Sequence, residues 1–227
     1  MIDVALIKQQ AIEGYPLECA WLVYGGQCSQ VKNIANDPSR EFKVSRADMA
    51  AATLGGLEAI IHSHPDYPDC PSASDMRGQE LSGVPWGIVA TDGVDATEIC
   101  WFGDQVEKQP LIGRGFRHGV TDCYALIRDY YKSELGIDLI NFHRDWDWWN
   151  NGGDLYRDGI KPAGFRVIDQ SEAKPGDMWI AQVRSPVPNH GGILLDNGLA
   201  LHHPSAKNPV DAAQLSRREP IESWLPY

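Results

Sequence analysis

The sequence has no apolar run long enough to cross a membrane and no leader-like start. A membrane-spanning helix needs about 18 or more apolar residues in succession, and such a run occurs nowhere in the 227 residues. Residues 1–20 also lack the continuous apolar block and small-residue cleavage pattern of a secretory signal peptide. We therefore expect no transmembrane segment, and a protein that is made and folded in a cytoplasm.

Cysteine is scarce, and its spacing is not that of a disulfide framework. There are five cysteines, and no two of them form a CxxC pair: Cys19, Cys28, Cys70, Cys100 and Cys123. An odd number in a chain of this size leaves at least one thiol without a disulfide partner. We therefore interpret the cysteines as candidate nucleophiles or small buried residues rather than as partners in disulfide bonds.

Basic residues are also in deficit. The chain has 20 Lys and Arg against 31 Asp and Glu, a net charge of −11. Residues 1–110 carry −9 and residues 111–227 carry −2. Because neither half is basic, nucleic acid is excluded as the expected partner, and protein or peptide partners are favoured. The step in charge suggests two structural units.

Hydrophobic periodicity supports two units of different class. Before residue 103 the pattern alternates, with helices expected over 1–12, 45–56 and 74–82 and strands over 19–25, 57–64, 86–93 and 97–103. Beyond a polar, Gly- and Pro-containing stretch, one helix over 121–136 precedes strands over 177–183, 190–196 and 199–204. We expect an α/β domain at 1–105, a linker at 106–116 and an α+β domain at 117–227.

A histidine–aspartate constellation ends the second expected strand of the first domain. His62 and His64 are two residues apart, so a strand turns both imidazoles to one face. Asp75 follows in the first turn of the next expected helix, which Ser72 or Ser74 can cap. Two imidazoles and a carboxylate are ligands typical of a catalytic zinc, with water in the fourth position. The simpler alternative is a polar surface loop, which the added Ser and Asp make less favoured.

This constellation resembles the JAMM/MPN metallopeptidases. The sequence H-S-H-P, six residues and S-x-x-D, with Glu18 after a Tyr-Pro turn upstream, matches their motif over about residues 10–102. The resemblance implies a cytidine-deaminase-like α/β fold and Zn²⁺ on His62, His64 and Asp75. It also implies Glu18 as general base, Ser72 as oxyanion stabiliser, and hydrolysis of an amide or isopeptide bond.

A second constellation joins Cys123 to a hairpin downstream. Cys123 stands near the start of an amphipathic helix, where backbone N–H groups and the helix dipole favour a thiolate. His190 opens one strand and His202 closes the return strand after a turn at Asp196–Gly198. The alternative is that Cys123 is only a small buried residue and that the histidines are solvated strand ends.

The length of the turn decides whether the two histidines share a face. A two-residue turn at Asn197–Gly198 pairs His202 with Ile193 and puts His190 on the opposite face. A three-residue turn pairs His202 with Gly192, on the face of His190. A shared function therefore predicts the three-residue turn or a bulge, with His203 pointing away.

The second constellation resembles the NlpC/P60 cysteine peptidases over about residues 112–227. The matching features are D-C at a helix start, K-P-G-D-M-W-I, and H-G-G-I-L-L-D-N-G followed by a histidine twelve residues after His190. The resemblance implies a papain-like fold with Cys123 as nucleophile, His190 as general base and acid, and His202 as orienting partner. Tyr124-Ala125 replaces the usual Ser-Gly after the cysteine, which affects the expected shape of the cleft.

Three tryptophans lie between Cys123 and His190 in the sequence. Trp146, Trp148 and Trp149 fit either a cleft wall or packing under a long loop, and packing is favoured. His118 and His143 have no evident partners in the sequence, and Cys70 is not needed by a three-ligand metal set.

The order of the two domains resembles a family that assembles the tail tip of lambda-like phages and prophages. It implies peptidoglycan peptides and other tail tip proteins as partners, and placement in the host cytoplasm during assembly and at the virion tail tip. Two alternatives stay open. One is an assembly scaffold that uses peptidase folds as binding modules, and the other is a protease that matures another tail component.

Overall fold

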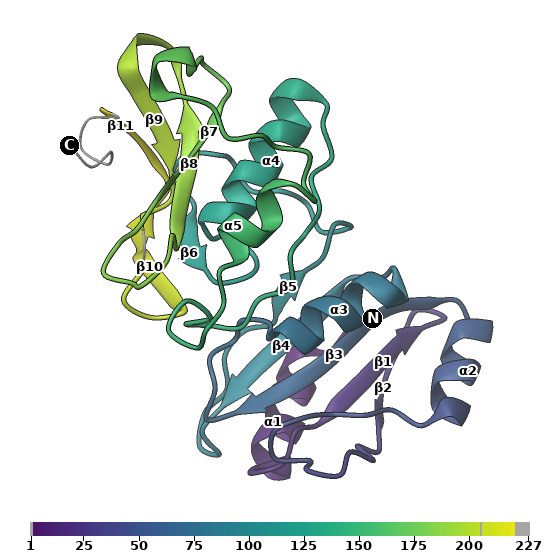
Figure 1. Ribbon diagram of the computed structural model, residues 1–227. Helices are drawn as coiled ribbons and strands as arrows, with labels where there is room; N and C mark the ends of the chain where they lie inside the picture. The colour runs from purple at the N-terminus through teal and green to yellow at the C-terminus, as the bar shows by residue number, and fades with distance from the viewer. Residues whose placement is uncertain (1, 205, 221–227) are drawn as a thin grey trace. The chain divides into compact units, whose positions relative to one another are not determined.

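The structure is a computed structural model that describes residues 2–204 and 206–220, so the end of the expected second domain, 221–227, lies outside the described residues. The chain divides into two compact units, Met1–Glu107 and Lys108–Tyr227 (Figure 1). The expected succession of an α/β domain and an α+β domain is confirmed. Within the described residues, no helix has the length and apolar composition needed to span a membrane.

The first unit is a five-stranded sheet with helices. Its strands lie in the order β2-β1-β3-β4-β5. Neighbours β3 and β4 are parallel and are connected through α3, as a parallel pair requires a crossover. The elements are α1 (Val4–Gly14), β1 (Ala20–Tyr24), β2 (Gln27–Val31), α2 (Arg46–Leu54), β3 (Leu57–Pro65), α3 (Ala73–Ser82), β4 (Trp86–Thr91) and β5 (Cys100–Phe102).

Alternation along β3 separates a hydrophobic face from a polar one. Ile61 is fully buried in a cluster with Trp21 of β1 and with Ile7 and Ala11 of α1. His62, the next residue, therefore projects from the opposite face of the sheet. The core on one side thus fixes which residues are presented on the other side.

The second unit contains a four-stranded antiparallel sheet in the order β11-β9-β8-β7 and a separate β10-β6 pair. Figure 1 shows α4 and α5 on one face of the larger sheet. The elements are β6 (Gly115–Arg117), α4 (Cys123–Leu135), α5 (Leu155–Ile160), η1 (Gln170–Glu172), β7 (Met178–Ala181), β8 (His190–Leu194), η2 (Asp196–Gly198), β9 (Leu199–His202), β10 (Val210–Leu215) and β11 (Arg217–Pro220).

The core of this unit lies between α4 and the sheet. Leu126 and Ile127 of α4 are fully buried against Ile193 of β8 and Leu201 of β9. Asp122 caps the N-terminus of α4 through the Ala125 N–H, and a left-handed Gly136 (φ 68°) ends the helix.

The expected helices and strands are all present, although β5 is shorter than the expected 97–103. The hydrophobic pattern of the sequence did not predict five elements, β2, β6, β10, β11 and α5. These elements are short or polar: β2 reads QCSQV, and β11 reads RREP. Strands at a sheet edge need no alternating apolar face, so the hydrophobic pattern does not reveal them.

Two candidate active sites

The first candidate site lies on the polar face of the first sheet. His62 and His64 project from the end of β3, and Asp75 projects from the first turn of α3. The two Nε2 atoms are 3.0 Å apart. The Asp75 oxygens lie 3.4 Å from Nε2 of His62 and 3.5 Å from Nε2 of His64. All three residues are buried. Their ligand atoms all lie within 4.8 Å of one another, so the carboxylate and both imidazoles converge on one point.

The spacing of these atoms fits a metal ion. With zinc–nitrogen and zinc–oxygen distances of about 2.0–2.1 Å, the corners of a tetrahedral site are about 3.3 Å apart. The observed separations of 3.0, 3.4 and 3.5 Å bracket that value. Two imidazoles and one carboxylate also form a donor set typical of catalytic zinc, and the three residues leave a fourth position for water.

Local hydrogen bonds hold two of the three side chains in place. Nδ1 of His64 lies 3.0 Å from the Pro68 carbonyl, which directs Nε2 toward the cluster. Ser72 caps α3, and its Oγ donates to Oδ2 of Asp75 at 2.7 Å. Although burial acts to raise it, the neighbouring histidines hold the pKa of Asp75 well below its usual range. Ser72 thus orients the carboxylate and stands beside the cluster.

Strand register brings Glu18 to the same place. Ala20 pairs with His62, and the Ser63 N–H donates to the Cys19 carbonyl, so the next position, Glu18, lies opposite His64. Glu18 is 6% exposed. Burial raises the pKa of Glu18 to about 7, and the charge of His64 acts in the opposite direction. A carboxyl group with that pKa exchanges a proton near neutral pH.

The second candidate site begins at the N-terminus of α4. The Cys123 sulfur lies 3.2 Å from the Tyr156 hydroxyl. Burial, and then the charge of Asp122, raise the pKa of Cys123 to about 11, while hydrogen bonds from Tyr156 and the Gly191 backbone act to lower it. Burial thus acts against the thiolate that the helix N-terminus favours, and in this structure removal from water has the larger effect on the pKa of Cys123.

The hairpin of β8 and β9 has the register that a shared function requires. His202 pairs with Gly192, and the turn is Asp196–Gly198, so the three-residue turn is confirmed. Nε2 of His190 lies 3.0 Å from Nδ1 of His202. His203 points elsewhere, as expected: its Nε2 lies 2.8 Å from the Gln214 carbonyl.

Cys123 contacts this hairpin at the backbone of β8. The Gly191 backbone interacts with the thiol, and Gly191 directly follows His190 in β8. The two rings of His190 and His202 are fully buried and share one face of the sheet with Trp179. Burial, followed by the neighbouring histidines, lowers the pKa of His190 to about 3, so its resting ring is neutral.

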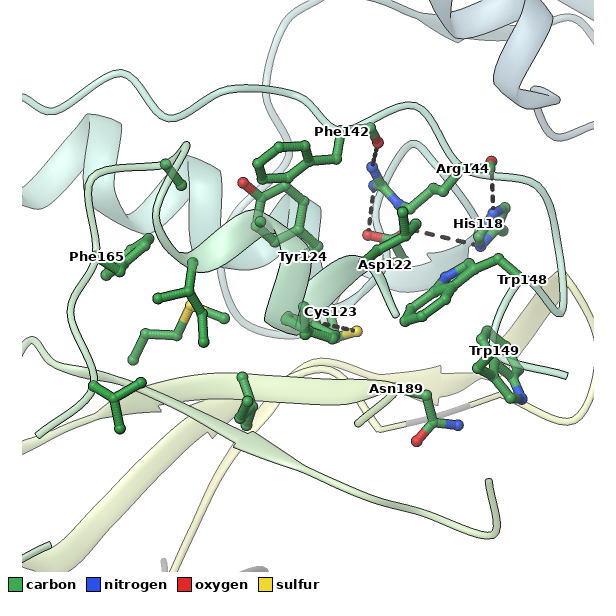
Figure 2. Close-up of a pocket in the computed structure, with 18 of the residues that line it drawn as sticks. His118, Asp122, Cys123, Tyr124, Phe142, Arg144, Trp148, Trp149, Phe165 and Asn189 are labelled. Atoms are coloured by element: carbon green, nitrogen blue, oxygen red, sulfur yellow. Dashed lines mark hydrogen bonds and ion pairs between the residues drawn. The ribbon is translucent and has the colours of Figure 1, made fainter. Parts of the chain in front are cut away.

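Sequence reasoning missed a buried ion pair behind the cysteine. Arg144 donates to both oxygens of Asp122, from Nε at 2.8 Å and from Nη2 at 2.9 Å (Figure 2). His118, which had no evident partner, lies 3.7 Å from Asp122 and 3.1 Å from the Arg144 carbonyl. The only feature of the sequence that indicates this ion pair is the dipeptide Asp122-Cys123, because an aspartate that is buried at the start of a helix needs a cationic partner.

A cavity of about 250 Å³ opens in front of Cys123. Figure 2 shows Trp148 and Trp149 on one side of it and Phe165 on the other. Trp146 also lines the cavity. The favoured interpretation of the tryptophans, packing under a loop, is incomplete, because the same rings that pack against one another also form the wall of the cavity.

Two protein families match the chain. Residues 4–102 match the prokaryotic homologs of the JAB domain, and residues 113–225 match the NlpC/P60 family.

Three individual proteins are also similar. The tail tip assembly protein K of Escherichia phage lambda is 37% identical over 171 residues, covering 75% of this chain and 78% of that protein. Its namesake from Escherichia phage N15 is 35% identical over 206 residues, covering 87% and 82%. The crystal structure of the NlpC/P60 domain of the peptidoglycan hydrolase SagA is 19% identical, with a TM-score of 0.34, and covers 50% of this chain and 82% of that one.

Proposed function

Because the chain belongs to the family of phage tail tip assembly proteins K, and carries a JAB-like and an NlpC/P60 unit, we propose that it is a two-centre peptidase of the tail tip. The second unit cuts peptide bonds in peptidoglycan stem peptides. In this role the chain joins the tail tip in the host cytoplasm and acts on the cell wall during infection. The partners of the chain are then cell-wall peptides and other tail tip proteins.

Two observations support the cysteine centre: the 3.0 Å contact between His190 and His202, and the contact of the Cys123 thiol with the backbone of Gly191, the residue after His190. His190 uses Nε2 toward His202, which assigns Nδ1 to the exchange with sulfur. As the substrate binds, the thiol proton moves to His190, and the sulfur attacks the peptide carbonyl carbon. His190 then gives that proton to the leaving amine, and water hydrolyses the thioester.

Other parts of the unit support this chemistry. Cys123 begins α4, which has 13 residues, so the positive end of the helix dipole lies at the nucleophile and stabilises the carbonyl oxygen as it becomes negative. The resting thiol and imidazole are both neutral, so the nucleophile forms only when a substrate is in place. The aromatic cavity beside Cys123 accommodates the acyl side of the peptide.

The first unit provides the second centre, an amide or isopeptide hydrolase. His62, His64 and Asp75 would hold zinc, which would supply Lewis-acid activation of a water molecule and polarisation of the substrate carbonyl. Glu18 accepts the proton of the attacking water, in keeping with its burial and its pKa of about 7. Ser72 keeps Asp75 oriented and offers its hydroxyl to the carbonyl oxygen.

Defined muropeptides incubated with the purified full chain test the proposal, with products identified by mass spectrometry. We expect cleavage by the wild type and by Glu18→Gln, and no cleavage by Cys123→Ala. Cys28→Ala, a change at a half-buried cysteine of the other unit, is the matched control and retains cleavage. If the folded wild type leaves muropeptides intact, the cell-wall substrate is wrong. A mass change of a tail protein during assembly then indicates maturation, and no mass change indicates a scaffold.

A further inference from the structure

A carboxylate from the edge strand extends the histidine pair. Nε2 of His202 lies 3.2 Å from Oε2 of Glu219 on β11, while Nδ1 of the same ring faces His190 at 3.0 Å. The row therefore runs from His190 through His202 to Glu219. No sequence motif connects Glu219 with the cysteine, which is 96 positions earlier in the numbering.

Strand register explains why Glu219 reaches this row. Arg217 pairs with His202, and Glu219 pairs with Ala200, so both β11 residues share the face of His202. Arg218 pairs with Leu201 and projects from the opposite face. β11 is an edge strand, and the Glu219 side chain is 26% exposed, so its carboxylate keeps access to water while its Oε2 meets the buried ring.

The chemistry of the three groups fixes where the protons are. An ionised carboxylate only accepts hydrogen bonds, so Nε2 of His202 must donate to Glu219. The Nδ1 of a neutral His202 is then an acceptor, and Nε2 of His190 must donate to it. The remaining nitrogen of a neutral His190, Nδ1, consequently has no proton and is the one able to take the proton of Cys123.

We propose that Glu219 is a positioning residue that sets the tautomers of His202 and His190 and so keeps Nδ1 of His190 basic. This inference rests on the proposed cysteine peptidase function. When the thiol proton moves to Nδ1 of His190, the other two protons of the row stay where they are. The Glu219 charge then stabilises the new imidazolium through the intervening His202 ring.

The charged surroundings are consistent with two neutral rings. Burial is the largest influence that lowers the pKa of His202, and Glu219 acts to raise it while Arg217 and His203 act to lower it. His190 is fully buried and neutral at pH 7. Arg217 also contacts Oε1, the second oxygen of Glu219, so the carboxyl group lies between a guanidinium group and the His202 ring.

Histidine ¹⁵N spectra of the full chain, selectively labelled at its seven histidines, test the tautomers directly. Signals of the pair are assigned from His190→Gln and His202→Gln. In the wild type at neutral pH we expect both rings protonated on Nε2 only. In Glu219→Ala we expect part of His190 to carry its proton on Nδ1, with kcat on a cleaved peptide lowered by about 10–100-fold and KM unchanged.

Two further variants separate the causes. The amide oxygen of Glu219→Gln still accepts from His202 but has no charge, so the tautomer is retained and kcat falls to an intermediate value. Arg218→Ala, on the same strand but the opposite face, leaves both spectrum and kcat unchanged.

The spectra need no substrate, so the two proposals fail separately. If the wild type does not cut muropeptides but Glu219→Ala changes the His190 tautomer, the substrate is wrong and the role of Glu219 stands. An unchanged His190 tautomer in folded Glu219→Ala would overturn the role of Glu219, whatever the chain cleaves.

Discussion

Nε2 of His190 lies 3.0 Å from Nδ1 of His202, across two neighbouring strands joined by a three-residue turn. The contact depends on the parity of that turn, because a slip of one residue moves every side chain of a strand to its other face. The histidine pair is therefore a property of the hairpin's length as much as of the two residues themselves.

Deletion of Asn197 should abolish the cysteine-dependent hydrolysis. A two-residue turn pairs His202 with Ile193 and removes its ring from His190, whereas Asn197→Ala keeps the loop length and should keep activity. Muropeptide cleavage and far-UV circular dichroism measure the two effects. Full activity in a folded deletion variant would show that His202 is not needed on that face.

Alkylation of Cys123 by iodoacetamide should be slow at neutral pH and should rise with pH toward about 11, because burial raises the pKa of Cys123 to about 11 and only the thiolate reacts. Peptide mapping by mass spectrometry separates Cys123 from the other cysteines. Tyr156→Phe removes a hydrogen bond that lowers this pKa, so its alkylation should be slower still.

Tyr124→Phe is the matched control for this experiment. The Tyr124 hydroxyl donates to the Ile140 carbonyl rather than to the sulfur, so its loss should leave the alkylation profile in place. Rapid alkylation at pH 6 that does not depend on pH would instead indicate a thiolate already paired with an imidazolium ion.

Arg144→Met should destabilise the second unit by about 3–5 kcal/mol, because it leaves the Asp122 carboxylate buried without a partner. The Arg144 charge holds the pKa of Asp122 below its usual range against the opposing effect of burial. The stabilisation is therefore present above pH of about 4 and is lost as pH falls below it. Urea unfolding at several pH values, followed by tryptophan fluorescence, measures the difference.

Two variants control the Arg144 experiment. Arg157→Met breaks an exposed pair with Asp154 and should cost less than about 1 kcal/mol. The double variant Asp122→Asn, Arg144→Met also removes the unpaired carboxylate charge, so it should recover part of the free energy of unfolding that Arg144→Met loses. Equal stability of Arg144→Met and the wild type would mean that Asp122 is not held by this ion pair.

The first unit should retain about one zinc per chain after dialysis, and Asp75→Asn should lose it, because one carboxylate completes the three-ligand set. Glu98→Gln, at an exposed acid of the same unit, should keep the metal. Elemental analysis measures zinc directly, without an assay of activity. Equal zinc in wild type and Asp75→Asn would exclude this cluster as the metal site.

Local sequence determined most of the elements and both chemical motifs. The spacing of His62 and His64 fixes one face of a strand, Ser72 and Asp75 form a capping box, and Gly136 ends α4, since each depends on residues within a few positions. The hairpin also depends on nearby residues. Counting residues across the turn shows that His190 and His202 share a face only with a three-residue turn, and the sequence left open which turn forms.

Tertiary structure decided what depends on residues distant in sequence. Arg144 reaches Asp122 across 22 positions, and Glu219 reaches His202 across 17, through a polar edge strand that no hydrophobic pattern reveals. The protonation state of Cys123 was also decided there. Its place at a helix N-terminus favours a thiolate, but burial against β8 favours the thiol, and desolvation in a folded interior is the larger effect.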